Sequence, residues 1–273
     1  MTKRKPPSVL VRFFNPKGDI PVRVSLVASS IPFGIVFLTW CLLSYSGYVP
    51  YFFLPSPTAV LGATIKLVTS EGLINHAWVS FYRISFGFVA AAVLAVPLGI
   101  LMGSFRIVQA LIEPINDFIR YLPVAAFIPL AILWTGIGDF EKVVIIFIGT
   151  FFQLILLVAE NARIVPAEYL EVAYTLGGSR WAAITKVLTP AASPAILDSL
   201  RIAVGWAWSY LVVAEIVAAN RGLGYLIIQG QRFLKTPQIV AVIFIIGLIG
   251  LSTDQLFRLA SHRLFPWRRE THH

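Results

Sequence analysis

The sequence predicts an all-α membrane protein with six transmembrane helices and a polar helix-turn-helix between the fourth and the fifth. Composition is the first reason: 58% of the 273 residues are apolar and 13% are charged, against roughly 25% charged in a soluble domain. The second reason is a set of apolar runs, each long enough to cross a bilayer, which needs about 20 residues. The third is a one-sided distribution of lysine and arginine between these runs.

The predicted elements follow in chain order. Residues 1–24 are rich in Lys, Arg and Pro and form a predicted cytoplasmic tail, and residues 263–273 form a second one. Residues 25–262 make one transmembrane domain, with spans at about 25–46, 79–103, 107–135, 140–160, 194–218 and 238–260. A short amphipathic helix from Ala59 to Thr69, capped near Ser56 or Thr58, is expected between the first two spans.

The third span contains three prolines, Pro114, Pro123 and Pro129, and is therefore expected to be kinked or broken. Backbone groups freed by such a break are tolerated at membrane depth only where protein or a water-filled cavity satisfies them. The region around residues 107–135 is therefore a candidate cavity wall.

The basic residues give the orientation. With six spans both termini lie on one side, and 15 of the 22 lysines and arginines fall in the segments of that side. The opposite side holds Lys66, Lys142, Arg221, Arg232 and Lys235. Because positive residues concentrate in cytoplasmic segments, both termini and residues 161–193 are predicted to be cytoplasmic. This bias also accounts for the net charge of +9, so nucleic acid is not an expected partner.

Residues 166–190, which we call the docking segment, form a polar island between two apolar runs. A helix is expected to start at Pro166, to break at Gly177 and Gly178, to restart with Ser179 as its N-cap and to stop at Pro190. Such a polar segment cannot face lipid, so we interpret it as a docking element for another protein. The alternative is an ordinary cytoplasmic loop in which Glu171 is only solvated.

The sequence lacks the residues that several other classes of site require. Cys41 is the only cysteine, which excludes an intrachain disulfide and a cysteine metal cluster. His76 and His262 are isolated, so no metal site is expected. The sequence has no G-x-x-x-x-G-K-[ST] loop and therefore does not bind ATP phosphates through such a loop. Gly222-x-Gly224 is interpreted as a turn outside the membrane.

Polar residues inside the third span suggest a pathway. Glu113, Asn116, Asp117 and Arg120 recur at spacings of three and four and share one helical face. In one interpretation Asn116 and Arg120 line a translocation pathway and attract an anion. In the other, Glu113 or Asp117 neutralises Arg120 inside the bundle, as intramembrane charges usually require.

The fifth span carries aromatic bulk and an acid. Trp206 and Trp208 point to different faces, so at most one of them easily lines a pore. We favour Trp208 as a steric gate, together with Glu215 two turns later in a structural or gating role. Arg83, at the start of the second span, is expected to extend its guanidinium to the membrane surface.

The docking segment resembles a family signature. Glu171, Ala173, Gly177, Val187 and Pro190 fit the pattern E-A-A, three residues, G, nine residues, I-x-L-P, which is the cytoplasmic loop of permease subunits of ATP-binding-cassette (ABC) importers. Val172 and Thr189 depart from this pattern, and neither departure removes the helix-turn-helix.

The resemblance extends from about residue 50 to the C-terminus. Leu54-Pro-Ser-Pro, Pro97-Leu-Gly-Ile-Leu-Met-Gly and Val213-Ala-Glu-Ile-Val look like the taurine, alkanesulfonate, nitrate and bicarbonate branch of the family. The ending Arg263-Leu-Phe-Pro-Trp is most similar to taurine permeases.

This resemblance implies a fold and a role: the transmembrane domain of a type I ABC importer in the bacterial inner membrane. Two permease chains, expected to be identical, would form the pathway for a small oxyanion. Taurine or another sulfonate is the first expectation for this anion, and nitrate and bicarbonate are the alternatives. Two ATPase chains, which carry ATP and Mg, would contact Glu171, Ala173, Gly177 and Pro190. A periplasmic or lipid-anchored binding protein would deliver the substrate, and this chain would not itself be an enzyme.

Two other classes remain as alternatives. An ion-coupled secondary transporter or channel would need no ATPase and would act through this chain alone. A membrane enzyme would need a catalytic His, Glu or Asp cluster, which the spans lack.

Overall fold

A computed structural model describes residues 21–267, and every regular element in that range is helical. Most of the first predicted tail and residues 268–273 of the second lie outside the described residues. The elements are α2 (Val22–Tyr45), α3 (Pro57–Thr69), α4 (Leu73–Ser104), α5 (Arg106–Arg120), the 3-10 helix η1 (Val124–Phe127), α6 (Ile128–Thr135), α7 (Asp139–Arg163), α8 (Ala167–Thr175), α9 (Arg180–Ala183), the π-helical turn η2 (Ile184–Leu188), α10 (Thr189–Ala218), α11 (Leu223–Arg232) and α12 (Thr236–Leu264).

The chain divides into two compact units at Leu61 and Gly62. In the first unit, α2 is a single apolar helix long enough to span a bilayer. Trp40 Nε1 donates a hydrogen bond to the carbonyl of Pro55, 2.9 Å away, and so ties the following loop to the helix. The backbone N–H of Ala59 donates to Ser56 Oγ at 3.4 Å, which confirms Ser56 as a cap of α3.

Four further helices of the second unit are long and apolar enough to cross a membrane, and α5 with η1 and α6 form a fifth, bent candidate. Together with α2, the described residues therefore hold up to six spans, by length and composition. α10 continues directly from α9 and η2, so the span that contains it is one helix of 39 residues, Arg180–Ala218.

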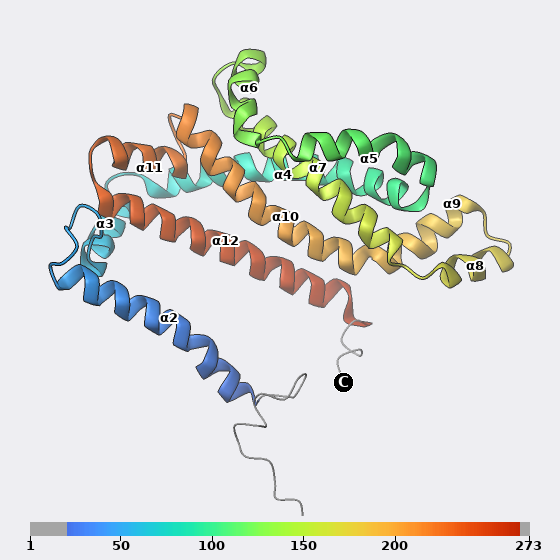
Figure 1. Ribbon diagram of the computed structural model, residues 1–273, viewed down its shortest axis with the longest axis horizontal. Coiled ribbons are helices and arrows are strands. Elements are labelled where there is room, and N and C mark those ends of the chain that lie inside the picture. The colour runs from blue at the N-terminus through green and yellow to red at the C-terminus, as the bar shows by residue number, and fades with distance from the viewer. Residues whose placement is uncertain (1–20, 268–273) are drawn as a thin grey trace, which may run out of the picture. The chain divides into compact units, whose positions relative to one another are not determined.

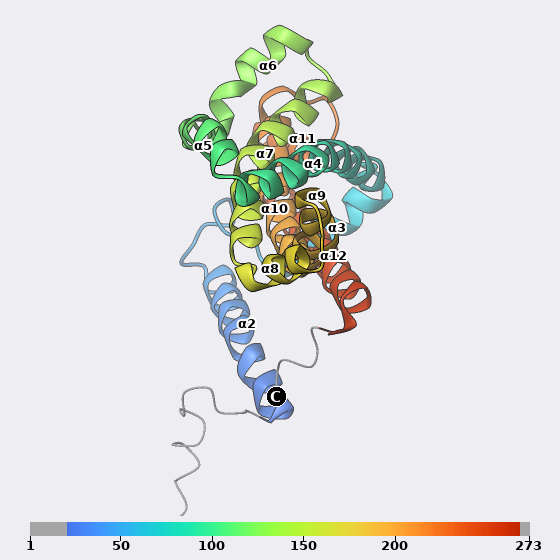
Figure 2. The same cartoon turned by 90° about the vertical axis from the view of Figure 1, so that its right-hand side faces the viewer.

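The core of the second unit is the packing of α4 on α7, and α10 packs against both of these helices (Figures 1 and 2). One face of α4 carries small residues at intervals of four: Gly87, Ala91, Ala95, Gly99 and Gly103. Small side chains let two helices approach closely, which is a common solution in membranes, where burial of apolar surface gives little driving force for helix association.

The glycines of this face set the distance between α4 and α7. A Cβ atom at Gly99 would lie 2.6 Å from Val158 Cβ, and one at Gly103 would lie 2.5 Å from the carbonyl oxygen of Ala159. Real Cβ contacts are not this short, so any larger residue would force the two helices apart.

The same contacts give the direction of the helices. Gly87 lies against Ile146 and Gly99 against Val158, so α4 and α7 run parallel. The chain must therefore return from the end of α4 to the start of α7, and α5, η1 and α6 make this return. α10 runs antiparallel to α7, since Asn161 bonds to Ser199 near one end and Lys142 bonds to Ala218 at the other.

The prediction of a broken third span is confirmed. α5 and the η1–α6 helix meet at an angle of 89°. Pro123 lies at this break, whereas Pro114 lies inside α5 and Pro129 occupies the first turn of α6. A first-turn proline needs no N–H partner, so only Pro123 marks the bend.

We predict that valine at Gly99 destabilises the fold by about 1–3 kcal/mol, because it overpacks the contact between α4 and α7. The measurement is the denaturation of the purified protein in detergent, with tryptophan fluorescence as the signal of unfolding. Gly247→Val is the matched control, since no atom lies within 4 Å of a Cβ there and that glycine is also in a long apolar helix. Equal stability of the two variants would contradict the assigned packing.

Candidate functional site

The docking segment begins as the sequence predicts. Its first helix, α8, starts at Ala167 directly after Pro166 and ends at Thr175. The N–H of Gly178 donates to the carbonyl of Ala173, and the N–H of Gly177 donates to that of Tyr174, both at 2.9 Å. This pair of bonds is a Schellman ending. Gly177 has a φ of +80°, a conformation that favours glycine, so its predicted role as the helix terminator is confirmed.

The second half of the docking segment differs from the prediction. Ser179 is the N-cap, as expected, and its Oγ accepts the N–H of Ala182 at 3.2 Å. The expected helix stop at Pro190 is wrong, because the helix continues through η2 into α10. A proline ring clashes with the carbonyl one turn earlier in a regular α-helix. The wider π-helical turn just before Pro190 offers a way to relieve this clash.

The docking segment exposes both acids and large apolar side chains. Glu168 and Glu171 are exposed, and Ala173 is half-buried. Exposed apolar residues surround them: Tyr169, Val172, Tyr174, Leu176 and Trp181. Apolar groups gathered on an exposed surface are typical of a protein contact. The segment lies at one end of the second unit, and α11 lies at the opposite end (Figure 1).

The predicted pathway residues of α5 are held in different ways. Asn116 is buried, and neither polar atom of its side chain has a hydrogen-bond partner. Arg120 Nε lies 3.0 Å from Asp117 Oδ1, in an ion pair without aligned hydrogen-bond geometry. Its guanidinium also lies 4.5 Å from the ring centre of Tyr121. The ion pair between Arg120 and Asp117 is therefore present, but both side chains are partly exposed and the pair is not buried inside the bundle.

The residues of α10 are buried. Trp208 is 5% exposed, its indole N–H has no partner within the described range, and Glu215 is fully buried. The pathway role of Asn116, Arg120, Trp208 and Glu215 stays a prediction.

Glu215 is the centre of a buried polar cluster. Its carboxylate accepts hydrogen bonds from the hydroxyl of Ser80 at 2.8 Å, from Arg83 Nη1 at 2.7 Å and from the N–H of Gly224 at 2.7 Å. A buried carboxylate is stable only with such partners. Ser80 also accepts the N–H of Leu223 at 2.8 Å, so the start of α11 is fixed to α4.

The expectation that Arg83 extends to the membrane surface is wrong. The side chain is 5% exposed and turns into the bundle, where it bonds Glu215. Its Nε donates to Asp139 Oδ1 at 2.9 Å, and its Nη1 donates to the carbonyl of Arg221 at 2.8 Å. One guanidinium thus joins α4 to α7, to α10 and to the loop after α10, because its planar fork can serve several acceptors at once.

A second charged pair closes the same end of the bundle. Lys142 is buried in the first turns of α7 and contacts Glu141 at 2.6 Å. Its ammonium also donates to the carbonyl of Ala218, the last residue of α10, at 2.6 Å. Lys142 therefore fixes the start of α7 to the end of α10.

Glycines allow the loop to approach the buried acid. A Cβ at Gly224 would lie 2.6 Å from Glu215 Cβ, and a Cβ at Gly222 would overlap the carboxylate itself. Gly222 has a φ of +121° and lies directly before α11, so it belongs to the predicted turn, whereas Leu223 and Gly224 already form the first turn of α11.

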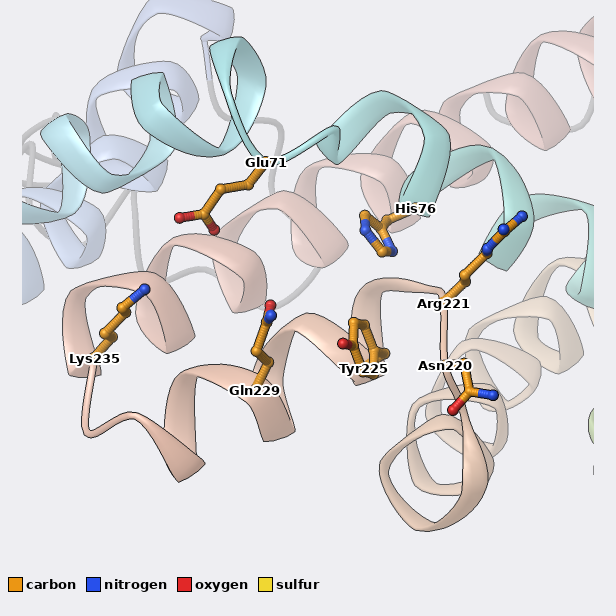
Figure 3. Close-up of a pocket in the computed structure, with 7 residues that line it drawn as sticks. All are labelled: Glu71, His76, Asn220, Arg221, Tyr225, Gln229 and Lys235. Carbon is orange, nitrogen blue, oxygen red and sulfur yellow. The ribbon is translucent and has the colours of Figure 1, made fainter.

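A polar pocket opens at this end of the unit, with a volume of about 450 Å³. Figure 3 shows its lining side chains, which come from α4, α11 and the connections on either side of these helices: Glu71, His76, Asn220, Arg221, Tyr225, Gln229 and Lys235. We call it the outer pocket. Within residues 21–267 no three His, Cys, Asp or Glu side chains lie together as metal ligands would.

Comparison with known proteins identifies the family. Residues 95–266 match the family described as binding-protein-dependent transport system inner membrane component. A putative ABC transporter permease protein of Methanocaldococcus jannaschii is 34% identical over 93% of this chain and 98% of its own length.

Relatives with named substrates are similarly close. The putative aliphatic sulfonates transport permease protein SsuC of Bacillus subtilis is 33% identical over 86% of this chain and 85% of its own. The taurine transport system permease protein TauC of Escherichia coli is 31% identical over 86% of this chain and 88% of its own.

The fold is that of a known transporter subunit. A chain of the MetNI methionine ABC transporter in an inward-facing conformation superposes with a TM-score of 0.57 and 20% sequence identity. The match covers 68% of this chain and 95% of the other.

We predict that Arg83→Leu destabilises the protein by about 3–5 kcal/mol, because it leaves Glu215 buried with its charge unpaired. The double variant Arg83→Leu/Glu215→Leu should lose much less than the sum of the two single variants. Asp139→Asn is the control and should cost less than about 1 kcal/mol, since that carboxylate is half exposed. Denaturation in detergent measures the stability of the two single variants, the double variant and Asp139→Asn. Additive losses of stability would show that Arg83 and Glu215 are not coupled.

Proposed function

The chain belongs to the family of binding-protein-dependent transport system inner membrane components, and from this membership we propose that it is the permease of an ATP-driven importer of small oxyanions. Taurine or another sulfonate is the first candidate, with nitrate and bicarbonate as alternatives. The observation that carries the proposal is the identity of 31–33%, over 86% of the chain, to permeases named for sulfonates and taurine.

The assembly follows from the same proposal. Two copies of this chain form the pathway, because a two-fold pair is the commonest oligomer. Two separate ATPase chains bind ATP and Mg and receive the docking segment. A periplasmic or lipid-anchored binding protein delivers the substrate. Native mass spectrometry of the purified complex should show equal numbers of permease and ATPase chains, and an active complex with one permease copy would contradict the pair.

The orientation is proposed from charge. The docking segment and both termini lie on the cytoplasmic side of the bacterial inner membrane, because most lysines and arginines fall on that side of the six spans. α7 ends at the docking segment and begins beside Ala218, so the buried ionic cluster and the outer pocket lie at the extracytoplasmic end.

The docking segment has the structure that a coupling element needs. Two helical pieces joined at Gly177 project acids and apolar side chains from the end of the unit. Its second piece continues into α10 without interruption. Movement of an ATPase surface against α8 and α9 can therefore act directly on a membrane-spanning helix.

We predict ATP-dependent uptake of taurine or another small oxyanion by proteoliposomes that contain this chain, its ATPase and its binding protein. Gly177→Val should reduce uptake at least tenfold while the complex still assembles, because valine does not fit a φ of +80°. Gly177→Asn is the matched control and should retain most uptake, since asparagine tolerates that conformation. Glu171→Arg should also reduce uptake, and Glu171→Gln should reduce it less.

The same assay separates the alternatives. Uptake by this chain alone, driven by an ion gradient without ATP, would establish a secondary transporter and overturn the proposal. Normal uptake by Gly177→Val would show that the helix ending plays no part in coupling.

We predict that the pathway residues become accessible to water during transport. Cysteines placed at Asn116, Arg120 and Trp208, after Cys41→Ala, should react with small water-soluble thiol reagents, at rates that change when ATP is trapped. Ile243 is exposed on a long apolar helix and serves as the lipid-facing control, which should not react. Protection of all three positions in every nucleotide state would show that they are packing residues.

A further inference from the structure

The outer pocket lies at the end of the bundle that the docking segment does not reach. In Figure 3, His76 and Tyr225 stand at its centre, with Arg221 on one side and Glu71 and Lys235 on the other. Its volume of about 450 Å³ is within the usual range for small-molecule sites, roughly 300–1,000 Å³. Its lining is polar, unlike the apolar surfaces of the membrane-spanning helices.

The charges of the pocket favour an anion. Arg221 and Lys235 carry positive charge, and across residues 21–267 neither has a carboxylate within 4.0 Å. Glu71 is the one acid of the lining, and Lys66, which does not line the pocket, lies 3.9 Å from it. The pocket thus offers two uncompensated cations against one partly compensated acid.

The neutral groups of the pocket add hydrogen-bond donors. His76 Nδ1 accepts the N–H of Gly222 at 3.0 Å, so the neutral imidazole carries its proton on Nε2. The imidazole stacks on the ring of Tyr225 at 5.8 Å, which fixes both rings. The Tyr225 hydroxyl and the amides of Asn220 and Gln229 can also donate. Donors of this kind match the oxygens of a sulfonate or nitrate, and the exposed Arg221 adds positive charge at the edge of the pocket.

The backbone that carries these groups is held in place. The carbonyl of Arg221 accepts from the buried Arg83 at 2.8 Å, and the N–H groups of Gly222, Leu223 and Gly224 bond to His76, Ser80 and Glu215 respectively. A site fixed before its ligand arrives loses less entropy on binding. The buried cluster therefore gives the pocket a constant shape.

We propose that the outer pocket binds a small oxyanion of the sulfonate or nitrate type before that anion crosses the membrane. The direction of movement rests on the proposed function, whereas the binding itself does not. Arg221 and Lys235 supply the attraction, and His76, Tyr225 and Gln229 supply donors that distinguish an oxyanion from a spherical halide.

The test uses the complex with its ATPase in nanodiscs, without binding protein, in a Cys41→Ala background. Cysteine at Gln229 is labelled with two methanethiosulfonates of similar size, one bearing a sulfonate and one a trimethylammonium group. The labelling rate of each reagent is divided by its rate with a free thiol in solution. The ratio of the two normalised rates reports the electrostatic potential at the cysteine, and the sulfonate reagent should react faster. Arg221→Gln should lower the ratio of the two rates about two- to fivefold, as expected for one unit charge within a Debye length.

The control is Arg106→Gln. Arg106 is an exposed cation that does not line the pocket and follows Phe105, which contacts Trp181 of the docking segment at the other end of the unit. Because it lies far beyond a Debye length from the cysteine, its loss should leave the ratio nearly unchanged. Taurine and nitrate should also slow labelling of the cysteine at Gln229, and sodium chloride of the same ionic strength as the nitrate should slow it less. Arg221→Gln should weaken that protection.

Three results would overturn the proposal. The first is an equal effect of Arg221→Gln and Arg106→Gln. The second is equal protection by chloride and by the oxyanions. The third comes from a separate sample to which binding protein is added: protection by that protein without protection by any oxyanion would assign the pocket to an acidic group of the binding protein. Uptake by the same complex reconstituted into proteoliposomes with binding protein keeps the two proposals apart. Normal uptake without oxyanion protection would contradict only the pocket, and oxyanion protection without uptake would contradict only the importer.

Discussion

The structure of the second unit depends on one constraint, the burial of a carboxylate at Glu215. An ionised group placed among apolar helices must be paired and hydrogen-bonded, or the fold loses several kcal/mol. Here the partners come from three places in the chain: Ser80 and Arg83 on α4, Gly224 at the start of α11, and Asp139, through Arg83, on α7. The hydrogen bonds and the ion pair that Glu215 requires therefore fix the relative positions of four helices at one end of the bundle.

The opposite end is built differently, and α10 connects the two. The docking segment has no buried ionic cluster, and its short helices are held by a Schellman ending, a serine cap and a ring contact between Trp181 and Phe105 at 6.3 Å. The helix that begins there at Arg180 continues to Ala218 and carries Glu215 near its far end. A displacement of the docking segment is thus transmitted along a helix whose other end is anchored by charge.

Local features could be predicted from the sequence, and long-range pairings could not. Apolar runs, the Gly177 ending, the Ser179 cap and the presence of a break in the third span depend on neighbouring residues, so composition and spacing predict them. Arg83 and Glu215 are 132 positions apart, and only the packing of α4 against α10 shows that they are partners. The helix continues past Pro190 through a π-helical turn that no local sequence pattern predicts. The pair of Arg120 and Asp117 is predictable as a candidate, because the two residues are three positions apart on one helix.

These pairings change how charge can act on a passing anion. Glu215 would repel an anion if it were free, but Arg83 neutralises it inside the bundle. Arg120 would attract one, but Asp117 is its partner. Lys142 is likewise compensated by Glu141. Arg221 and Lys235, which have no carboxylate within 4.0 Å among residues 21–267, line the outer pocket instead. A low-dielectric interior makes a free charge both costly and strongly attractive, so an anion held there would leave slowly. Placing the attraction at the hydrated surface, where it is screened and reversible, lets an anion gather at the pocket without being trapped in the membrane.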